Sequence, residues 1–258
     1  MRLFDSHSHI DDPCYDADLA QVLLRARAAD VQGIMIAGIN VGTSAKAITI
    51  AGSHPGIITS VGVHPHDATD CSDLAIEALK DLAQNPCVKA WGEIGLDFNR
   101  MYSPAAVQEQ WLEAQLHAAC DLGLPVIFHE RDSGGRFLEM VQPCKRLPLR
   151  GVVHCFSGTR EEMFSYLDLG FYIGITGILT IQKRGELLRE LAALIPEDRL
   201  LIETDAPYLT PAPEKNRSRR NEPAFVRSVF LKLAEIRKAD PEALAETLWD
   251  NTCRLFGL

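Results

Sequence analysis

Residues 88–132 read VKAWGEIGLDFNRMYSPAAVQEQWLEAQLHAACDLGLPVIFHERD, and this stretch decides the fold. It begins with an apolar run at 88–92, continues into a segment with 3.6-residue apolar spacing at 105–122, and ends with an apolar run at 125–128. Gly123 marks the junction between the helical segment and the second run. Two short apolar runs around an amphipathic helix predict parallel strands that are joined by a helical crossover.

The same alternation recurs along the whole chain. The apolar runs predicted as strands are Leu3–Phe4, Gly33–Ala37, Ile57–Val63, Val88–Gly92, Pro125–Phe128, Gly151–Val153, Phe171–Ile175 and Leu200–Ile202. Helical spacing is seen at Leu19–Ala29, Leu74–Ala83, Ala105–Leu122, Arg136–Val141, Glu161–Leu169, Leu187–Leu194, Ala224–Arg237 and Pro241–Phe256. Eight such repeats predict an α/β fold, a closed (β/α)8 TIM barrel, rather than an open doubly wound sheet. We expect a single domain over residues 1–258, with an extra C-terminal helix.

The composition and net charge exclude some classes of protein. A hydrophobic fraction of 47% and a charged fraction of 24% are typical of a folded domain and argue against disorder. Lys and Arg number 26 and Asp and Glu number 35, so the net charge is −9. This balance excludes a basic protein that coats nucleic acid. A phosphate polyanion would need local positive charge from a bound metal or from an arginine cluster.

The sequence favours a cytoplasmic protein without a membrane segment. No run of about 18 apolar residues is present. The charge of Asp5 interrupts the N-terminus before a secretory apolar region can form. The seven cysteines are scattered and form no C-x-x-C pair, which favours reduced thiols over a disulfide framework or a Cys-zinc site.

Six of the eight predicted strands end in a side chain that can carry chemistry. They are His7 and His9 after the first strand, His64 at the end of the third, Glu93 of the fourth, His129 of the fifth, His154 of the sixth and Asp205 of the eighth. A single histidine at a strand end is usually structural. Agreement at six ends favours a functional site, because the carboxyl ends of barrel strands carry the active site in this fold.

Four imidazoles and two carboxylates together predict a divalent metal site, with Mg, Mn or Zn as the candidates. Six ligands are enough for two ions, and a carboxylate such as Glu93 can bridge them. The expected division places one ion on His7, His9, Glu93 and Asp205, and the other on Glu93, His129 and His154. We expect Asp205 to act also as a general base and His64 to orient or protonate the leaving oxygen, so the predicted catalytic residues are Asp205, Glu93 and His64.

Basic residues near this rim are candidates for holding substrate phosphates. They are Arg131, two residues after His129, and Arg219 and Arg220 in a loop that also carries Lys215 and Arg217. Two plainer interpretations stay open. The loop arginines can be ordinary solvated charges, and Arg131 can pair with Glu130 or Asp132.

The sequence leaves the roles of some other polar and aromatic residues open. His66 is a possible rim residue, whereas we expect His54 and His117 to be structural or exposed. Phe98, Tyr102 and Tyr208 can stack on single-stranded bases or simply pack.

These segments together resemble the TatD family of metal-dependent deoxyribonucleases. The matching motifs are DSHSHID (5–11), GVHPHD (62–67), GEIGLDF (92–98), LPVIFHERD (124–132), VVHCFSG (152–158), YIGITG (172–177), ETDAPYLTP (203–211) and RRNEP (219–223). The resemblance covers essentially the whole chain. It implies a (β/α)8 barrel with His7, His9, Glu93, His129, His154 and Asp205 as metal ligands and His64 as a pocket histidine. It also implies magnesium-dependent DNA hydrolysis, often from the 3′ end.

The expected function is a metal-dependent phosphodiesterase or nuclease that hydrolyses single-stranded DNA from the 3′ end through a metal-activated water. Nucleic acid is the expected partner, and no obligate protein partner is expected. The alternative is a metal-dependent amidohydrolase or esterase acting on a small or aminoacyl-tRNA substrate. Many amidohydrolases bridge their metals with a carboxylated lysine on strand four, whereas here the strand ends in Glu93 and Lys89 lies four residues upstream. A third interpretation, a non-catalytic binding protein, is disfavoured because unused ligands would bury polar groups at a cost in stability.

Overall fold

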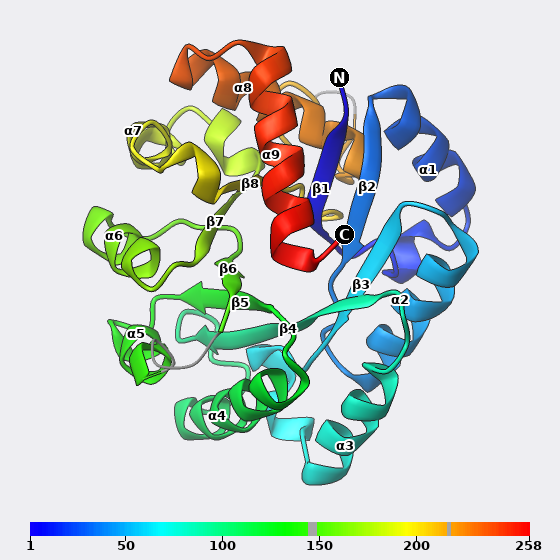
Figure 1. Ribbon diagram of the computed structural model, residues 1–258, viewed down its shortest axis with the longest axis vertical. Helices are drawn as coiled ribbons and strands as arrows, with labels where there is room; N and C mark the ends of the chain where they lie inside the picture. Colours follow the sequence, from blue (N-terminus) through cyan, green and yellow to red (C-terminus); the bar gives the residue numbers. More distant parts are fainter. Residues whose placement is uncertain (144–148, 216–217) are drawn as a thin grey trace. The chain divides into compact units, whose positions relative to one another are not determined.

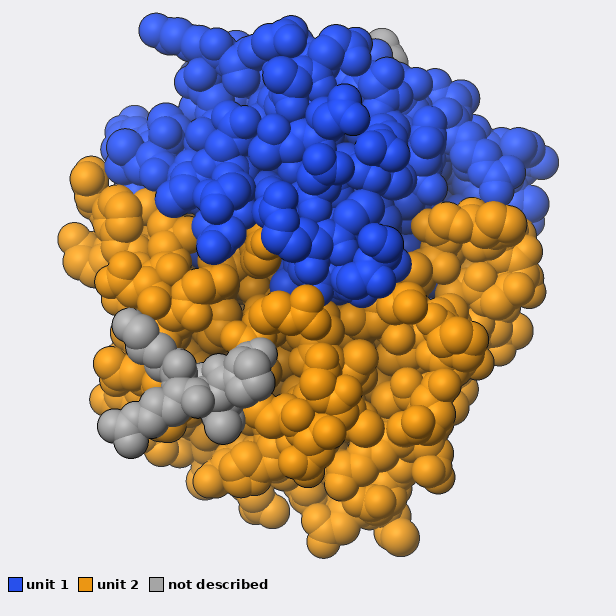
Figure 2. All heavy atoms as spheres, viewed as in Figure 1, with its two compact units in different colours: residues 1–36, 173–258 blue, residues 37–172 orange. Residues whose placement is uncertain are grey.

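The computed structural model describes residues 1–143, 149–215 and 218–258. The chain forms two compact units, coloured separately in Figure 2. Unit 1 comprises residues 1–36 and 173–258, and unit 2 comprises residues 37–172.

Strands and helices alternate along the chain in the predicted order (Figure 1). The strands are β1 (Leu3–Ser8), β2 (Val31–Ile36), β3 (Ile57–Val61), β4 (Val88–Asp97), β5 (Val126–Arg131), β6 (Gly151–Val153), β7 (Tyr172–Ile175) and β8 (Leu200–Ile202). Each overlaps one of the eight predicted runs, so the number and order of the strands are confirmed.

In the part of the chain that the structure describes, an α-helix follows each of the eight strands, and a ninth helix ends the chain. They are α1 (Leu19–Ala28), α2 (Val41–Ser53), α3 (Asp73–Leu82), α4 (Ala105–Leu122), α5 (Arg136–Val141), α6 (Arg160–Asp168), α7 (Glu186–Ala192), α8 (Val226–Arg237) and α9 (Pro241–Phe256). The extra C-terminal helix, α9, is present with the predicted bounds. Among the described residues, no helix is long and apolar enough to cross a membrane.

Helix α2 was not among the predicted segments. Its sequence VGTSAKAITIAGS is rich in Gly, Ser and Thr, which are weak helix formers. The helix is started instead by a capping box, in which the Asn40 side chain accepts from the Thr43 N–H and the Thr43 hydroxyl accepts from the Asn40 N–H.

Unit 1 contains parallel strands in the order β7-β8-β1-β2. The first residue of β7, Tyr172, belongs to unit 2. A bridge between Ser8 and Ala206 joins β1 to the segment that follows β8. Every residue of β1 is buried, so this strand lies in the core of its unit. The end of β1 is therefore held beside the end of β8.

Unit 2 contains parallel strands in the order β3-β4-β5-β6. Its core includes the fully buried Trp91 of β4 and Phe128 of β5. Helix α4 packs against β4, and its 18 residues return the chain to the start of β5. Parallel pairing brings the carboxyl ends of these four strands to one edge of the unit.

Candidate metal centre

Three predicted ligands of unit 2 converge on one point. The Oε1 atom of Glu93 lies 2.7 Å from Nδ1 of His129 and 2.7 Å from Nε2 of His154. The two ring nitrogens lie 3.3 Å apart. Two imidazoles and one carboxylate so close together form a donor set that suits a divalent cation.

Glycines in β4 allow this approach of β4 to β5. Gly95 pairs with His129 in the register of the two strands and has φ +155°, in the region that favours glycine. A Cβ atom at Gly95 would lie 1.7 Å from the carbonyl oxygen of His129. Gly92 has φ +134°, and a Cβ there would lie 2.5 Å from the carbonyl oxygen of Ile127. The close backbone contact on both sides of Glu93 places its carboxylate beside the imidazole of β5.

His64 also faces this cluster, and it does so through its Nε2 atom. Its Nδ1 accepts the backbone N–H of His66 at 3.0 Å, so the proton of the neutral ring is on Nε2. That Nε2 lies 3.4 Å from Oε1 of Glu93 and 3.2 Å from Nδ1 of His129. Burial lowers the pKa of His64 to about 3, so the ring is neutral and offers a hydrogen-bond donor to the cluster.

Two further residues join this cluster: His66, which the sequence suggested as a rim residue, and Asp97, which was not singled out from the sequence. Oδ2 of Asp97 lies 2.7 Å from Nε2 of His66 and 3.3 Å from Nε2 of His129. Burial raises the pKa of Asp97, but the hydrogen bonds from His129, His66 and the Arg100 N–H outweigh it and hold the pKa well below its usual value. Strand alternation could have identified Asp97 from the sequence, because Glu93 and Asp97 are four residues apart and therefore lie on one face of β4.

Helix α4 holds the two segments that carry these residues. Gln108 accepts the backbone N–H of Asp97 at 2.8 Å and donates to its carbonyl at 3.1 Å. Gln115 accepts the N–H of Val63 at 2.7 Å and donates to its carbonyl at 3.0 Å, next to His64. The two glutamines are seven residues apart and therefore lie on one face of the helix. They satisfy backbone groups where the chain leaves the regular pairing of the sheet.

The other predicted ligands, His7, His9 and Asp205, come together in unit 1. The Nε2 atoms of His7 and His9 lie 3.2 Å apart. Oδ1 of Asp205 lies 3.8 Å from the first of them and 3.5 Å from the second. Two imidazole nitrogens that face one another beside a carboxylate form a second donor set of the type that binds a divalent cation.

Hydrogen bonds between β1 and the segment after β8 place this second group. The carboxylate of Asp5 accepts the N–H of Thr204 at 2.7 Å and its hydroxyl at 2.5 Å. The N–H of Asp205 donates to the carbonyl of His7 at 3.0 Å. Asp205 has φ +56°, a left-handed conformation that aspartate tolerates better than most residues.

The positions of the site residues relative to their strands differ from prediction. His7, Glu93 and His129 lie inside β1, β4 and β5, because these strands continue past them. In particular, β4 and β5 stay paired as far as Asp97 and Arg131, where the carboxyl-end side chains are still buried or half-buried. His64 and Asp205 lie three residues beyond their strands, and His154 directly follows β6 as predicted.

The three candidate phosphate-binding arginines have different surroundings. Arg220 donates to Asp18 at 2.8 and 2.7 Å and to the carbonyl of Cys14 at 2.6 Å, and it stacks on Tyr15. This guanidinium anchors its loop to the segment before α1. Its donors are engaged by protein oxygens, which does not support the phosphate-binding role predicted from the sequence. Within the described part of the chain, Arg219 is exposed and its guanidinium forms no ion pair.

Arg131 is half-buried at the end of β5, on the same face as His129. Among the described residues it forms no ion pair with Glu130 or Asp132, so the pairing considered from the sequence is wrong. Glu130 accepts from Ser133 instead, and Asp132 accepts from Asn99. Lys215 is exposed, whereas Arg217 lies outside the described residues.

The remaining predicted residues are mostly accessible. His117 is exposed on α4 and His54 is half-buried at the end of α2. Tyr102 is 66% exposed and contacts His66 edge-on, with the ring centres 4.8 Å apart. Tyr208 is 56% exposed and lies 6.1 Å from the ring of His9, while Phe98 is half-buried. None of the six described cysteines forms a disulfide.

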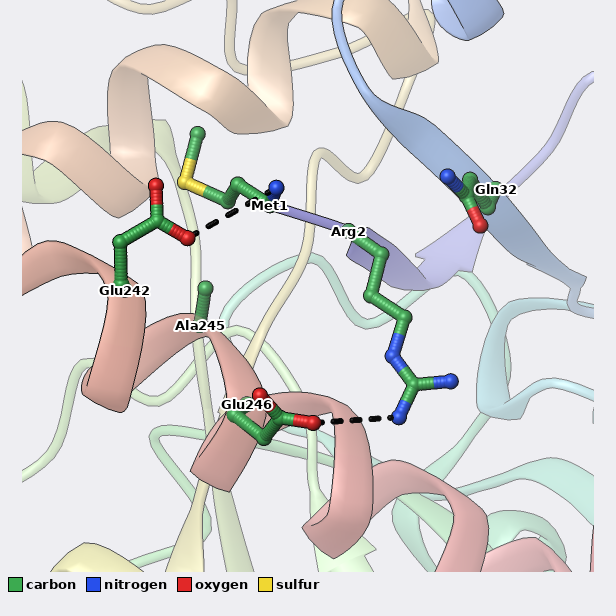
Figure 3. A pocket seen from close by; sticks show the side chains of 6 residues that line it. All are labelled: Met1, Arg2, Gln32, Glu242, Ala245 and Glu246. Atoms are coloured by element: carbon green, nitrogen blue, oxygen red, sulfur yellow. Dashed lines mark ion pairs between the residues drawn. The ribbon is translucent and has the colours of Figure 1, made fainter.

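A separate hollow of about 320 Å³ lies in unit 1, at the start of β1 (Figure 3). It is lined by Met1, Arg2, Gln32, Glu242, Ala245 and Glu246. The ion pairs drawn there join the N-terminal amine to Glu242 and Arg2 to Glu246. The hollow lies at the amino end of the strand, whereas His7 lies near the carboxyl end, so it is not part of the candidate metal centre.

The chain is similar to known proteins over its whole length. The family described as "TatD related DNase" matches residues 4–257. A protein of Rahnella sp. named "3'-5' ssDNA/RNA exonuclease TatD" is 44% identical over 259 residues, which cover 99% of this chain and 98% of that relative. A protein of the same name from Escherichia fergusonii is 42% identical, with 99% of each chain covered.

Solved structures agree with this assignment. The TatD homologue YjjV from Escherichia coli K12 has a TM-score of 0.92 and 31% identity, over 100% of this chain and 98% of that one. A TatD family hydrolase from Entamoeba histolytica has a TM-score of 0.89 and 26% identity, over 99% and 98% of the two chains. The predicted fold class, the (β/α)8 barrel, is confirmed. The chain belongs to the TatD-related DNase family.

Proposed function

We propose that this protein is a metal-dependent nuclease that removes nucleotides from the 3′ end of single-stranded DNA or RNA. The observation that carries the proposal is the convergence of Glu93, His129 and His154 on one point in unit 2. The family assignment supports it, because the curated relatives are named as 3′-5′ exonucleases of single-stranded DNA and RNA.

The donor groups fit divalent cations. In unit 2 the atoms of Glu93, His129 and His154 would hold one ion, and in unit 1 the atoms of His7, His9 and Asp205 would hold a second. Nitrogen and oxygen donors of this kind accept Mg, Mn or Zn. When bound, such ions would polarise a phosphodiester and lower the pKa of water toward neutrality.

Side chains of this protein supply the remaining functions. The carboxylate of Asp205 would accept the proton of the attacking water. The neutral ring of His64 would donate a hydrogen bond from Nε2 to the leaving oxygen. Arg131 and Arg219 would hold neighbouring phosphates, because guanidinium groups bind phosphate oxygens in a bidentate manner. Tyr102 and Tyr208 offer exposed rings on which bases can stack.

The direct test uses metal-free enzyme that is supplied with Mg, Mn or Zn in turn. Substrates are single-stranded DNA and RNA labelled at the 5′ end, the same strands with a blocked 3′ end, and a small aryl phosphodiester. We expect metal-dependent shortening of both strands from the 3′ end and protection by the block. Hydrolysis of a small amide or carboxylic ester, with no action on phosphodiesters, would instead support the amidohydrolase alternative.

The proposal also covers where the protein acts and whether it needs a protein partner. We infer a cytoplasmic location because the cysteines are scattered along the sequence and the six described ones form no disulfide, and we infer that no obligate protein partner is needed. Cell fractionation and the mass of the purified active protein test these two points.

A further inference from the structure

The two ring nitrogens of His129 face different kinds of neighbour. Its Nδ1 lies 2.7 Å from Oε1 of Glu93, 3.3 Å from Nε2 of His154 and 3.2 Å from Nε2 of His64. Its Nε2 lies 3.3 Å from Oδ2 of Asp97. One nitrogen therefore belongs to the donor cluster, and the other is turned away from it toward a buried carboxylate.

An ionised carboxylate has only acceptor atoms, so the ring nitrogen that faces Asp97 must carry a hydrogen. The lone pair needed to bind a cation is then on Nδ1, inside the cluster. Histidine ligands in metal sites commonly use such a partner to fix both the tautomer and the orientation of the ring.

We propose that Asp97 is a positioning residue that directs Nδ1 of His129 toward the metal by accepting the hydrogen on Nε2. The inference deepens the proposed function and rests on it, because it assumes that the cluster of unit 2 holds a cation. It adds a residue outside the ligand set predicted from the sequence.

The surroundings of Asp97 suit this role, because its carboxylate is itself held in place. The residue is 1% exposed. Its Oδ1 accepts the backbone N–H groups of Asn99 and Arg100 at 3.0 and 2.8 Å. Its Oδ2 is thereby left to face the imidazoles of His129 and His66. A rigid acceptor restricts the rotation of the ligand ring more than a mobile one does.

The substitution Asp97→Asn keeps the shape of the side chain and changes its hydrogen bonding. The amide oxygen can still accept from the two backbone N–H groups, but the amide NH2 then meets the N–H of His129. The ring must either lose this contact or move its hydrogen to Nδ1, where it blocks the metal. We expect the affinity for Zn, measured by competition with a chromophoric chelator, to fall about 10- to 100-fold.

Asp132→Asn is the matched control. The residue is an aspartate just after β5 that accepts from the Asn99 side chain at 2.7 Å and is outside the ligand cluster. The same chemical change there should leave the Zn affinity within about 2-fold of the wild-type value. Equal Zn affinity in Asp97→Asn and wild type would overturn the proposal.

A measurement on the wild-type protein keeps the test independent of how well Asp97→Asn folds. In ¹⁵N-labelled, zinc-loaded enzyme, the imidazole N–H signal that disappears in His129→Gln should come from Nε2 and exchange slowly with water. A proton on Nδ1 of His129 would contradict the inference. If zinc binds as expected but no nucleic acid is hydrolysed, the proposed function fails and the inference about Asp97 still stands.

Discussion

Glu93 is the residue on which the donor cluster of unit 2 depends. One of its carboxylate oxygens lies 2.7 Å from two imidazole nitrogens that belong to different strands or their ends. The side chain is almost fully buried, so it is held at this point rather than free to sample others. No other carboxylate of the described residues of unit 2 is placed between His129 and His154 in this way.

Glu93→Gln should therefore fold but lose at least about 100-fold in nuclease activity, because the removal of a direct ligand exceeds the 10- to 100-fold effect of an outer partner. Metal analysis by mass spectrometry, beside the nuclease assay, checks both parts. If Glu93 also serves a second ion, as the sequence predicts, both ions should be lost rather than one. His117→Gln, on the exposed face of α4, is the control. Normal turnover by Glu93→Gln in metal-supplemented buffer would remove this residue from the site.

His7 and His9 allow the unit 1 group to be tested separately. Replacement of both by Asn preserves polarity at the buried position of His7 but removes the two nitrogens that lie 3.2 Å apart. We expect bound metal to fall from two ions per chain to one, and activity to fall sharply without vanishing, because the unit 2 group is intact. Two ions retained in the double variant would show that this pair is not a ligand set.

At the scale of the elements, β4 is the strand whose backbone makes the site possible. Gly95 lies opposite His129, and its conformation and surroundings both exclude a side chain. Because β4 and β5 carry Glu93 and His129, a change in their spacing moves two ligands at once.

Gly95→Ala should lower both the melting temperature and the metal affinity. The added methyl would meet the carbonyl oxygen of His129 at 1.7 Å, so one strand must move. Gly52→Ala in α2 is the matched control, since a Cβ there has open space and alanine favours a helix by about 1 kcal/mol. Thermal melting and Zn titration of both variants decide the matter. A Gly95→Ala protein with wild-type metal affinity would mean that the strand spacing does not set the geometry of the ligands.

At the scale of the whole molecule, the net charge of −9 opposes binding of a polyanion. Affinity for DNA must then come from a few local cations, and its dependence on salt should be shallow. For single strands the slope of log affinity against log salt concentration changes by about 0.7 for each phosphate contact.

Adjacent arginines provide a comparison at this scale. Arg219→Ala should reduce the salt slope for single-stranded DNA by about 0.7, because it removes one exposed cation. Arg220→Ala should leave the slope unchanged and lower the melting temperature, because that guanidinium is bound to Asp18 and the carbonyl of Cys14. Fluorescence anisotropy of labelled DNA across a NaCl series, with thermal melting, measures both. A smaller salt slope for Arg220→Ala, with an unchanged slope for Arg219→Ala, would assign phosphate binding to Arg220.

Local patterns determined most of the fold and the types of residue at the site. Apolar runs and helical spacing predicted all eight strands and the bounds of α4, α5 and α9, because these patterns reflect which face of each element is buried. Helix α2 was not predicted from the sequence, because its start depends on a capping box rather than on strong helix formers. The polar residues near the strand ends were found because the carboxyl ends of parallel strands share one edge.

The tertiary structure alone decided which partners those residues have. Asp97 meets His66 across 31 positions of the chain, and Arg220 meets Asp18 across 202. No local period relates such residues, so their pairing depends on how the strands and loops pack. The same packing binds the guanidinium of Arg220 to Asp18, which favours an anchoring role over the phosphate-binding role predicted from the sequence. The sequence determined which chemical groups are available, and the three-dimensional distances determined what each of them touches.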